Sequence, residues 1–136
     1  MDNSHNGPVK KSVFIVEDDE EISFVLSFML EREGYEVTIS KDGRDALNLI
    51  DSAPETDMSA HPDLVLLDIM LPHFDGIQVL TYIRNHPTWK RVPVVMLTAK
   101  SQAANINEAF ALGANEYITK PFQPDEVLVR IKRFLN

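Results

Sequence analysis

Short apolar runs alternate along the chain with longer segments in which apolar residues recur at helical spacing. The short runs are rich in β-branched residues and predict strands over residues 12–16, 35–39, 63–68, 92–99 and 116–119. The longer segments carry an apolar residue every three or four positions and predict helices over residues 22–30, 43–51, 75–86, 102–112 and 124–135. The pattern therefore predicts strand–helix units in strict alternation.

Strict alternation of strands and helices is typical of a parallel sheet whose connections cross over with a right-handed sense. The run "SVFIV" at 12–16 has no charged position, as expected for a strand that is covered on both faces. We therefore expect an α/β fold of the (βα)5 type, a doubly wound five-stranded parallel sheet. In such sheets, functional groups gather at the carboxyl ends of the strands.

Several residues indicate where the helices begin and end. Gly34 and Gly113 are placed to end the first and fourth helices. Ser101 can cap the fourth helix, and Pro124 suits the first turn of the fifth. The loop residue Trp89 is expected to be partly exposed. The fourth helix is expected to bury one stripe, formed by Ile106, Ala109 and Phe110.

Composition narrows the class of protein. The chain has 136 residues, which suits one domain, and it has no cysteine, which excludes disulfides, thiolate metal sites and cysteine nucleophiles. A net charge of −8 makes nucleic acid an unfavourable direct partner and a divalent cation a more natural one. The sequence shows no signal peptide and no stretch of the ~18 apolar residues that a membrane span needs. We expect a cytoplasmic protein with a disordered arm at 1–10 and one domain at 11–136.

Acidic residues stand directly after two of the predicted strands. The first strand runs into "EDDEE" at 17–21, and the third ends at Asp68. If these strands are neighbours, Glu17, Asp18 and Asp68 converge at one rim of the sheet. Three carboxylates repel one another unless a cation neutralises them, and an all-oxygen site with few protein ligands suits Mg²⁺. The acids at 19–21 are also explained as a solvated helix start, where negative charge is favourable.

A hydroxyl and a cation stand at the ends of the fourth and fifth predicted strands. The fourth strand ends at Thr98 and the fifth ends near Lys120, so both are expected to face the acidic rim. A fixed positive charge and a hydroxyl donor can hold a phosphoryl group, because phosphoryl transfer needs mainly an in-line nucleophile and neutralised charge. Asp68 is the best-placed nucleophile, since carboxylates form acyl phosphates.

Four motifs in this order resemble the receiver domain of bacterial-type two-component response regulators. The motifs are "FIVEDDEE", "DLVLLDIMLPHFDG", "VPVVMLTA" and "GANEYITKPF". The resemblance covers about residues 11 to 135, and each motif falls at the end of the expected strand. It implies a chemotaxis-regulator-like fold with the flavodoxin-like strand order 2-1-3-4-5.

The resemblance also implies a phosphoacceptor and a metal site. Asp68 would receive its phosphoryl group from a phosphohistidine on a sensor histidine kinase or a histidine phosphotransfer protein. Asp18 would bind Mg²⁺ directly and Glu17 would bind it through water. Asp68 itself and the backbone carbonyl of Met70 would complete the protein ligands.

The resemblance further implies a switch. Thr98 would close on the phosphoryl group, Lys120 would pair with it, and Tyr117 would turn inward when Thr98 moves. The bond from Lys120 to Pro121 would be cis. The signal would leave through the face formed by helix 102–112, strand 116–119 and helix 124–135, towards a downstream effector or a C-terminal output domain. A phosphorylation-dependent homodimer is a further candidate.

Two features depart from the usual family pattern. The polar loop 52–62 is longer than usual, but it lies at the amino end of its strand, away from the predicted chemistry. Met70 and Lys100 stand at two positions that tune the lifetime of the phosphoryl group within the family. Methionine cannot orient an attacking water as an amide or carboxylate can, so we expect a long-lived phosphoryl group.

Other functions remain open at this stage. An Asp-nucleophile phosphohydrolase would need a second acid two residues after Asp68, where Met70 stands, and usually a cap domain. A flavin-binding protein would need a phosphate loop after the first strand, where "EDDEE" would repel phosphate. A receiver-like module that binds partners without phosphorylation would not need Asp18, Asp68, Thr98 and Lys120 together. The sequence leaves undecided whether the chain is a single-domain regulator or part of a longer one.

Overall fold

The computed structural model describes residues 10–54, 57 and 60–136. The expected disordered arm at 1–10 falls almost wholly outside the described residues, as does part of the loop 52–62. Strands and helices alternate strictly: β1 (Ser12–Val16), α1 (Glu20–Arg32), β2 (Glu36–Ser40), α2 (Gly43–Ser52), β3 (Leu64–Leu67), α3 (Gly76–Asn85), β4 (Val94–Thr98), α4 (Ala103–Ala111), β5 (Glu116–Thr119) and α5 (Pro124–Leu135).

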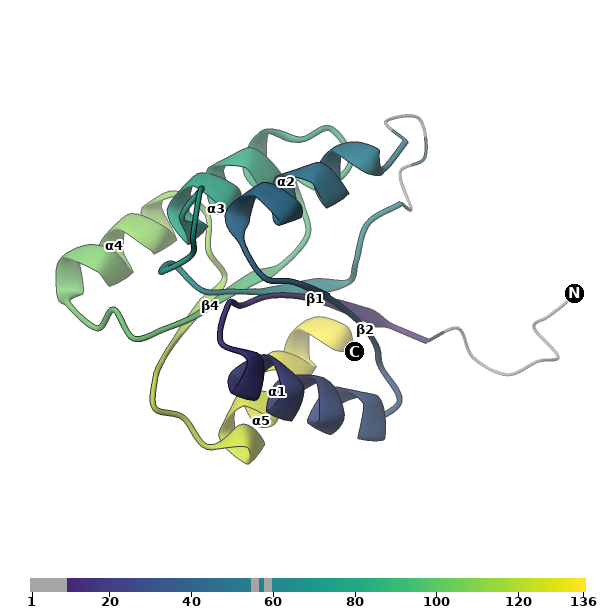
Figure 1. Ribbon diagram of the computed structural model, residues 1–136, viewed down its shortest axis with the longest axis vertical. Coiled ribbons are helices and arrows are strands. Elements are labelled where there is room, and N and C mark those ends of the chain that lie inside the picture. Colours follow the sequence, from purple (N-terminus) through teal and green to yellow (C-terminus); the bar gives the residue numbers. More distant parts are fainter. Residues whose placement is uncertain (1–9, 55–56, 58–59) are drawn as a thin grey trace, which may run out of the picture.

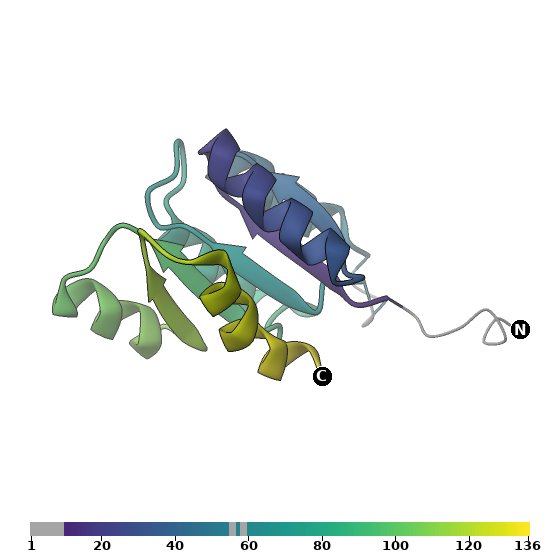
Figure 2. The same ribbon diagram turned by 90° about the horizontal axis from the view of Figure 1, so that it is seen from below.

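The strands form one parallel sheet in the order β2-β1-β3-β4-β5. The expected (βα)5 fold and its strand order are therefore confirmed. Helices α2, α3 and α4 cover one face of the sheet, and α1 and α5 cover the other (Figure 1). Figure 2 shows α1 and α5 lying across the same face of the sheet.

Each inner strand sends alternate side chains into two separate cores. Phe14 and Val65 pack beneath α2, α3 and α4, while Val13 and Leu64 pack beneath α1 and α5. Because both faces of β1, β3 and β4 are covered, these strands are almost entirely apolar, as parallel strands usually are. Burial of these runs fixes the register of the sheet and hence which residues meet at its carboxyl edge.

Most elements begin or end within about two residues of the predicted bounds, and for two of them a local reason can be given. Gly34 ends α1 with a φ of 93°, and the Tyr35 amide donates to Leu30 O at 3.1 Å. Tyr35 is thus part of the turn that closes α1, and β2 begins one residue later than predicted. Ser101 does not cap α4, because Gln102 is the N-cap residue and makes no side-chain capping bond.

Two aromatic residues also differ from the expectation. Phe110 was predicted to be buried but is 45% exposed, because α4 lies over the edge strand β5 and only a narrow part of the helix meets the sheet. Trp89 was predicted to be partly exposed but is 2% exposed, with its ring edge-on to Phe14 at 5.9 Å. The loop that carries Trp89 therefore folds into the core.

None of the helices in the described part of the chain combines the length and apolar character that crossing a membrane would require.

Candidate functional site

Two carboxylates meet at the carboxyl edge of the sheet because their strands are neighbours. In the pairing of β1 with β3, Val16 lies opposite Leu67, so the next residues, Glu17 and Asp68, lie side by side. The Asp68 amide continues the ladder by donating to Val16 O at 3.1 Å. Both side chains are buried, at 2% and 4% exposure.

A third carboxylate completes the cluster. Asp18 follows Glu17 and is exposed. One carboxylate oxygen from each of Glu17, Asp18 and Asp68 lies within 4.8 Å of the others, close enough for all three to share a cation. The predicted convergence of these three residues is confirmed. Their donor set is entirely oxygen, which fits Mg²⁺.

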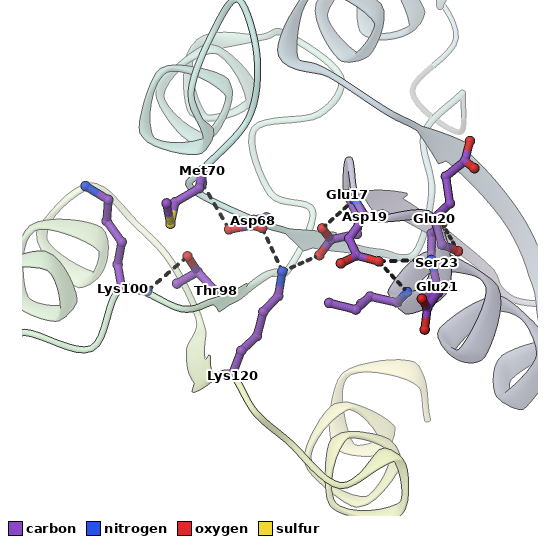
Figure 3. Close-up of polar contacts among 11 residues, drawn as sticks. Glu17, Asp19, Glu20, Glu21, Ser23, Asp68, Met70, Thr98, Lys100 and Lys120 are labelled. Atoms are coloured by element: carbon purple, nitrogen blue, oxygen red, sulfur yellow. Dashed lines mark hydrogen bonds and ion pairs between the residues drawn. The ribbon is translucent and has the colours of Figure 1, made fainter.

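Lys120 reaches the two buried carboxylates from the end of β5. Its Nζ donates to Asp68 Oδ2 at 2.8 Å and to Glu17 Oε1 at 2.7 Å (Figure 3). The peptide bond from Lys120 to Pro121 is cis, as expected. Two hydrogen bonds to charged acceptors hold the ammonium in place, and such bonds are stronger than those between neutral groups.

The electrostatics of the site reflect opposing effects. Burial raises the pKa of Glu17, and the negative charge of Asp68 adds to this, whereas hydrogen bonds from Lys120 and the Asp19 amide oppose it only in part. Burial by itself would lower the pKa of Lys120, but its hydrogen bonds to Asp68 and Glu17 outweigh burial and raise it. The lysine is therefore positively charged at neutral pH. The carboxylates still repel one another, and a further cation would offset this repulsion.

The loop after β3 is tightly folded and fixes Asp68. The Met70 amide donates to Asp68 Oδ1 at 3.0 Å, and the Gly76 amide donates to Ile69 O at 2.9 Å. A Cβ atom at Gly76 would lie 2.0 Å from Asp68 O, so only glycine fits there without a shift of the backbone. Asp75 caps α3 in a reciprocal capping box with Gln78, which "DGIQ" already signals in the sequence.

Thr98 and Lys100 lie on the other side of Asp68 from Glu17 (Figure 3). Thr98 ends β4 and is fully buried, its Oγ1 accepts from the Lys100 amide at 3.3 Å, and its backbone oxygen accepts from the Lys120 amide at 2.9 Å. A hollow of about 390 Å³ opens near this edge of the sheet and is lined by Asp18, Ile69, Met70, Leu71, Pro72, Asp75 and Lys100. Lys120 contacts Asp68 and Thr98 lies near it in Figure 3, while their part in holding a phosphoryl group stays a prediction.

Tyr117 is tied to the segment that follows Thr98. Its side chain is 7% exposed, and its hydroxyl donates to Lys100 O at 2.6 Å. Burial raises the pKa of Tyr117, and the charge of Asp68 contributes. The tyrosine is therefore already inward in this structure and contacts the same loop as Thr98, while its turning with Thr98 stays a prediction.

Two contacts were not predicted from the sequence. The pairing of Lys120 with Glu17 was missed, because Glu17 was considered only as a metal ligand. The network around Arg84, which joins α3 to the loops before β4 and β5, was also missed. A single arginine in the last turn of a helix gives no sequence signal beyond the favourable helix dipole.

Comparison with known proteins agrees with this geometry. Residues 13–132 match the family model of the response regulator receiver domain. The transcriptional regulatory protein SrrA of Staphylococcus aureus is 41% identical over 128 residues, covering 94% of this chain and 49% of the relative. The chain thus spans about half the length of that relative.

Solved structures of response regulators have a similar fold. The chemotaxis response regulator CheY4 of Vibrio cholerae superposes with a TM-score of 0.82 at 28% identity, covering 93% of this chain and 99% of that one. The BeF3-activated DrrB receiver domain superposes with a TM-score of 0.78 at 31% identity, covering 93% and 98%.

Proposed function

The chain belongs to the family of response regulator receiver domains, and on that premise we propose that it accepts a phosphoryl group on Asp68 and thereby changes how it binds a partner. The observation that carries this proposal is Lys120, whose ammonium lies between buried Asp68 and buried Glu17 at hydrogen-bonding distance. A buried carboxylate beside a fixed cation suits nucleophilic attack on a phosphoryl group.

The donor in this proposal is a phosphohistidine on a sensor histidine kinase or a histidine phosphotransfer protein. A carboxylate oxygen of Asp68 forms a bond to phosphorus while the bond from phosphorus to the imidazole nitrogen breaks, which leaves an acyl phosphate and a free histidine. Such kinases present phosphohistidine in the cytoplasm, so a cytoplasmic location belongs to the same proposal.

Each neighbouring residue has a part in holding the phosphoryl group. Lys120 neutralises charge on its oxygens, and the Thr98 hydroxyl, now accepting from the Lys100 amide, donates a hydrogen bond to it. Glu17, Asp18 and Asp68, with the backbone carbonyl of Met70, would hold Mg²⁺. Bound Mg²⁺ would supply further positive charge at the phosphoryl oxygens.

The response in this proposal passes from Thr98 to Tyr117 and on to the face of α4, β5 and α5. Both residues contact the backbone of Lys100, so a shift of Thr98 towards a phosphoryl group displaces the acceptor of the Tyr117 hydroxyl. Phosphorylation would then shift the equilibrium between two conformations of this face. An effector protein, an output domain of a longer chain or a second copy of this domain would bind one conformation more tightly.

The phosphohydrolase alternative is not favoured. Met70 stands where such enzymes need an acid, and its thioether can neither donate nor accept a proton. The family is a signalling domain, and we propose that this chain turns over only its own phosphoryl group.

Phosphorylation by a small donor tests the proposal. The protein is incubated with acetyl phosphate and Mg²⁺, and intact mass spectrometry measures the addition of one phosphoryl group. We expect labelling of the native protein and of Asp125→Asn, an exposed acid at the start of α5, but not of Asp68→Asn. Equal labelling of Asp68→Asn, or no labelling of the native protein, would contradict the proposal.

A further inference from the structure

Arg84, in the last turn of α3, joins segments that lie at the amino ends of β4 and β5. Its Nε donates to Gly113 O at 3.0 Å, and Nη2 donates to Gly113 O at 2.7 Å and to Asn115 Oδ1 at 2.9 Å. Its Nη1 donates to Val92 O at 2.7 Å and to Lys90 O at 3.2 Å. One side chain thus ties the end of α3 to the loop before β4 and to the loop before β5.

The partners of Arg84 are neutral oxygens. Within the part of the chain that the structure describes, no carboxylate pairs with this guanidinium, and burial lowers its pKa without removing its charge at neutral pH. Gly113 fits closely against it, because a Cβ at Gly113 would lie 2.8 Å from Arg84 Nε. Gly113 also ends α4, with a φ of 106°. The carboxyl end of α4 is therefore fixed to α3.

The amino end of α4 is held much less firmly. Its N-cap residue, Gln102, makes no side-chain capping bond, and residues 101–104 are all exposed. The side chains of α4 that pack against the core begin with half-buried Ile106 and continue with buried Ala109, and the Phe110 ring lies 6.5 Å from the Tyr117 ring. In Figure 2, α4 lies at one edge of the molecule, away from α1 and α5.

The loosely held end is the end next to the proposed phosphorylation site. The loop between β4 and α4 contacts Thr98 through the Lys100 amide and Tyr117 through the Lys100 carbonyl. A rearrangement at Thr98 therefore acts first on the amino end of α4. The nine residues of α4 span about 13 Å, so a tilt of about 10° around Gly113 would move that end by about 2 Å.

We propose that Arg84 is the anchor of a hinged helix: it holds the carboxyl end of α4 in place while the amino end swings in response to the phosphoryl group. This rests on the proposed phosphorylation of Asp68 and adds a pivot to it. Arg84 is a positioning residue that acts through α4 and has no contact with the phosphoryl group. Because one end of α4 is held, a small shift at Thr98 tilts the helix around Gly113 and does not move the whole helix.

Backbone NMR on the 136-residue chain tests the anchor. Amide resonances of α4 are recorded with and without beryllofluoride and Mg²⁺, and ¹⁵N relaxation is measured in the free protein. Fluorine NMR reports separately whether beryllofluoride binds. The test variant is Arg84→Lys, because lysine keeps the charge but has one nitrogen and cannot join three segments. Arg91→Lys, an exposed arginine in the loop before β4, is the matched control.

In the native protein and in Arg91→Lys, we expect the shift changes over residues 101–106 to be about threefold larger than those over 110–115, because displacement grows with distance from the pivot. In Arg84→Lys, changes at 110–115 should rise to match the amino end, and relaxation should show new motion at 112–115. The extent of phosphorylation by acetyl phosphate should be unchanged, because Arg84 lies at the opposite edge of the sheet.

Gly113→Ala provides a second way to disturb the anchor if Arg84→Lys does not fold, and it should give the same profile along α4. Equal shift changes at both ends of α4 in the native protein, or an Arg84→Lys profile like that of Arg91→Lys, would overturn the proposal. If fluorine NMR shows no binding of beryllofluoride, the proposed function fails by itself. Unchanged relaxation at 112–115 in Arg84→Lys would then still overturn the anchor.

Discussion

Two half-buried cations, at opposite edges of the sheet, are held in chemically different ways. Lys120, at the carboxyl edge, donates to the charged oxygens of Asp68 and Glu17, and this pairing raises its pKa. Arg84, at the amino edge, donates to backbone carbonyls and one amide oxygen, and burial lowers its pKa. Both cations connect elements that are far apart in the sequence.

We take this difference to separate a reactive site, around Lys120, from a structural joint, which is Arg84 with its oxygen partners. The carboxylates around Lys120 repel one another, and in the proposed function they bind Mg²⁺ beside Lys120 while Asp68 takes up a phosphoryl group. The carbonyls around Arg84 belong to the folded backbone and carry no net charge. In the two proposals, Lys120 therefore belongs to the reactive site and Arg84 to the anchor of α4.

The largest expected effect comes from replacing Lys120 by methionine. This leaves Asp68 and Glu17 buried without a counter-ion, and removing one member of a buried pair costs about 3 kcal/mol or more. Urea unfolding with a chelator should show this loss, and added Mg²⁺ should recover part of it, because the metal neutralises the same carboxylates. A loss that Mg²⁺ does not change would mean that the acidic cluster is not a cation site.

Replacing Arg84 by methionine should have a somewhat smaller effect that metal does not alter. Several carbonyls lose their donor, and an unsatisfied buried polar group costs about 1–3 kcal/mol. The measurement is the same unfolding series with and without Mg²⁺. If Mg²⁺ restored the stability of Arg84→Met as much as that of Lys120→Met, the proposed difference between the two cations would be wrong.

Gly76→Ala disturbs the acidic edge without changing any charge. A Cβ at this position would meet Asp68 O at 2.0 Å, so the loop must shift, at a cost of about 1–3 kcal/mol. We expect weaker Mg²⁺ binding by titration calorimetry and slower labelling by acetyl phosphate. Gly34→Ala, where a Cβ meets nothing within 4 Å but φ is 93°, controls for backbone strain alone. Unaltered Mg²⁺ binding in Gly76→Ala would argue against a metal ligand at Asp68.

Glu17→Gln should change stability less than the preceding substitutions, and it should stabilise the metal-free protein where they destabilise it. Burial raises the pKa of Glu17, so folding disfavours its charged form, and this cost is present above the folded-state pKa and vanishes as pH falls below the ordinary value of about 4.5. The metal-free variant should therefore be more stable than the native protein at pH 7. The difference should shrink when unfolding is measured at progressively lower pH, while Mg²⁺ affinity at pH 7 should fall. A variant that is less stable than the native protein at pH 7 would show that the hydrogen bond to Lys120 outweighs burial.

The smallest expected effect concerns the rate of phosphoryl loss. Met70 is 54% exposed beside Asp68, and its side chain cannot orient an attacking water. Met70→Asn should lose its phosphoryl group several-fold faster, because an amide can hold water near phosphorus. The rate is followed by intact mass after the donor is removed, with Met29→Leu, a buried substitution on α1, as control. An unchanged or slower rate in Met70→Asn would refute the expectation.

Much of the reactive edge could be predicted because it depends on local sequence and parallel topology. Glu17 and Asp68 each follow an apolar strand, so a correct strand order brings them together. Thr98 and Lys120 follow the same rule on the remaining strands. The predicted order 2-1-3-4-5 was sufficient to place all four at one edge.

The structural joint could not be predicted, because its partners are backbone atoms that only the folded chain brings together. Nothing near Arg84 in the sequence shows that Gly113 O lies within reach. The burial of Trp89 and the exposure of Phe110 were missed for a similar reason: periodicity gives the apolar face of a segment, but only the packed layers decide how much of that face is covered.

The central claim is that Asp68 itself forms the acyl phosphate, and reductive trapping tests it most directly. An acyl phosphate accepts hydride from borohydride and becomes an alcohol, which converts the modified aspartate into homoserine. After treatment with acetyl phosphate and Mg²⁺ and then borohydride, peptide mass spectrometry should find homoserine at position 68 and unmodified aspartate at positions 18 and 19. Homoserine at another aspartate, or a phosphorylated protein in which Asp68 is intact, would contradict the account.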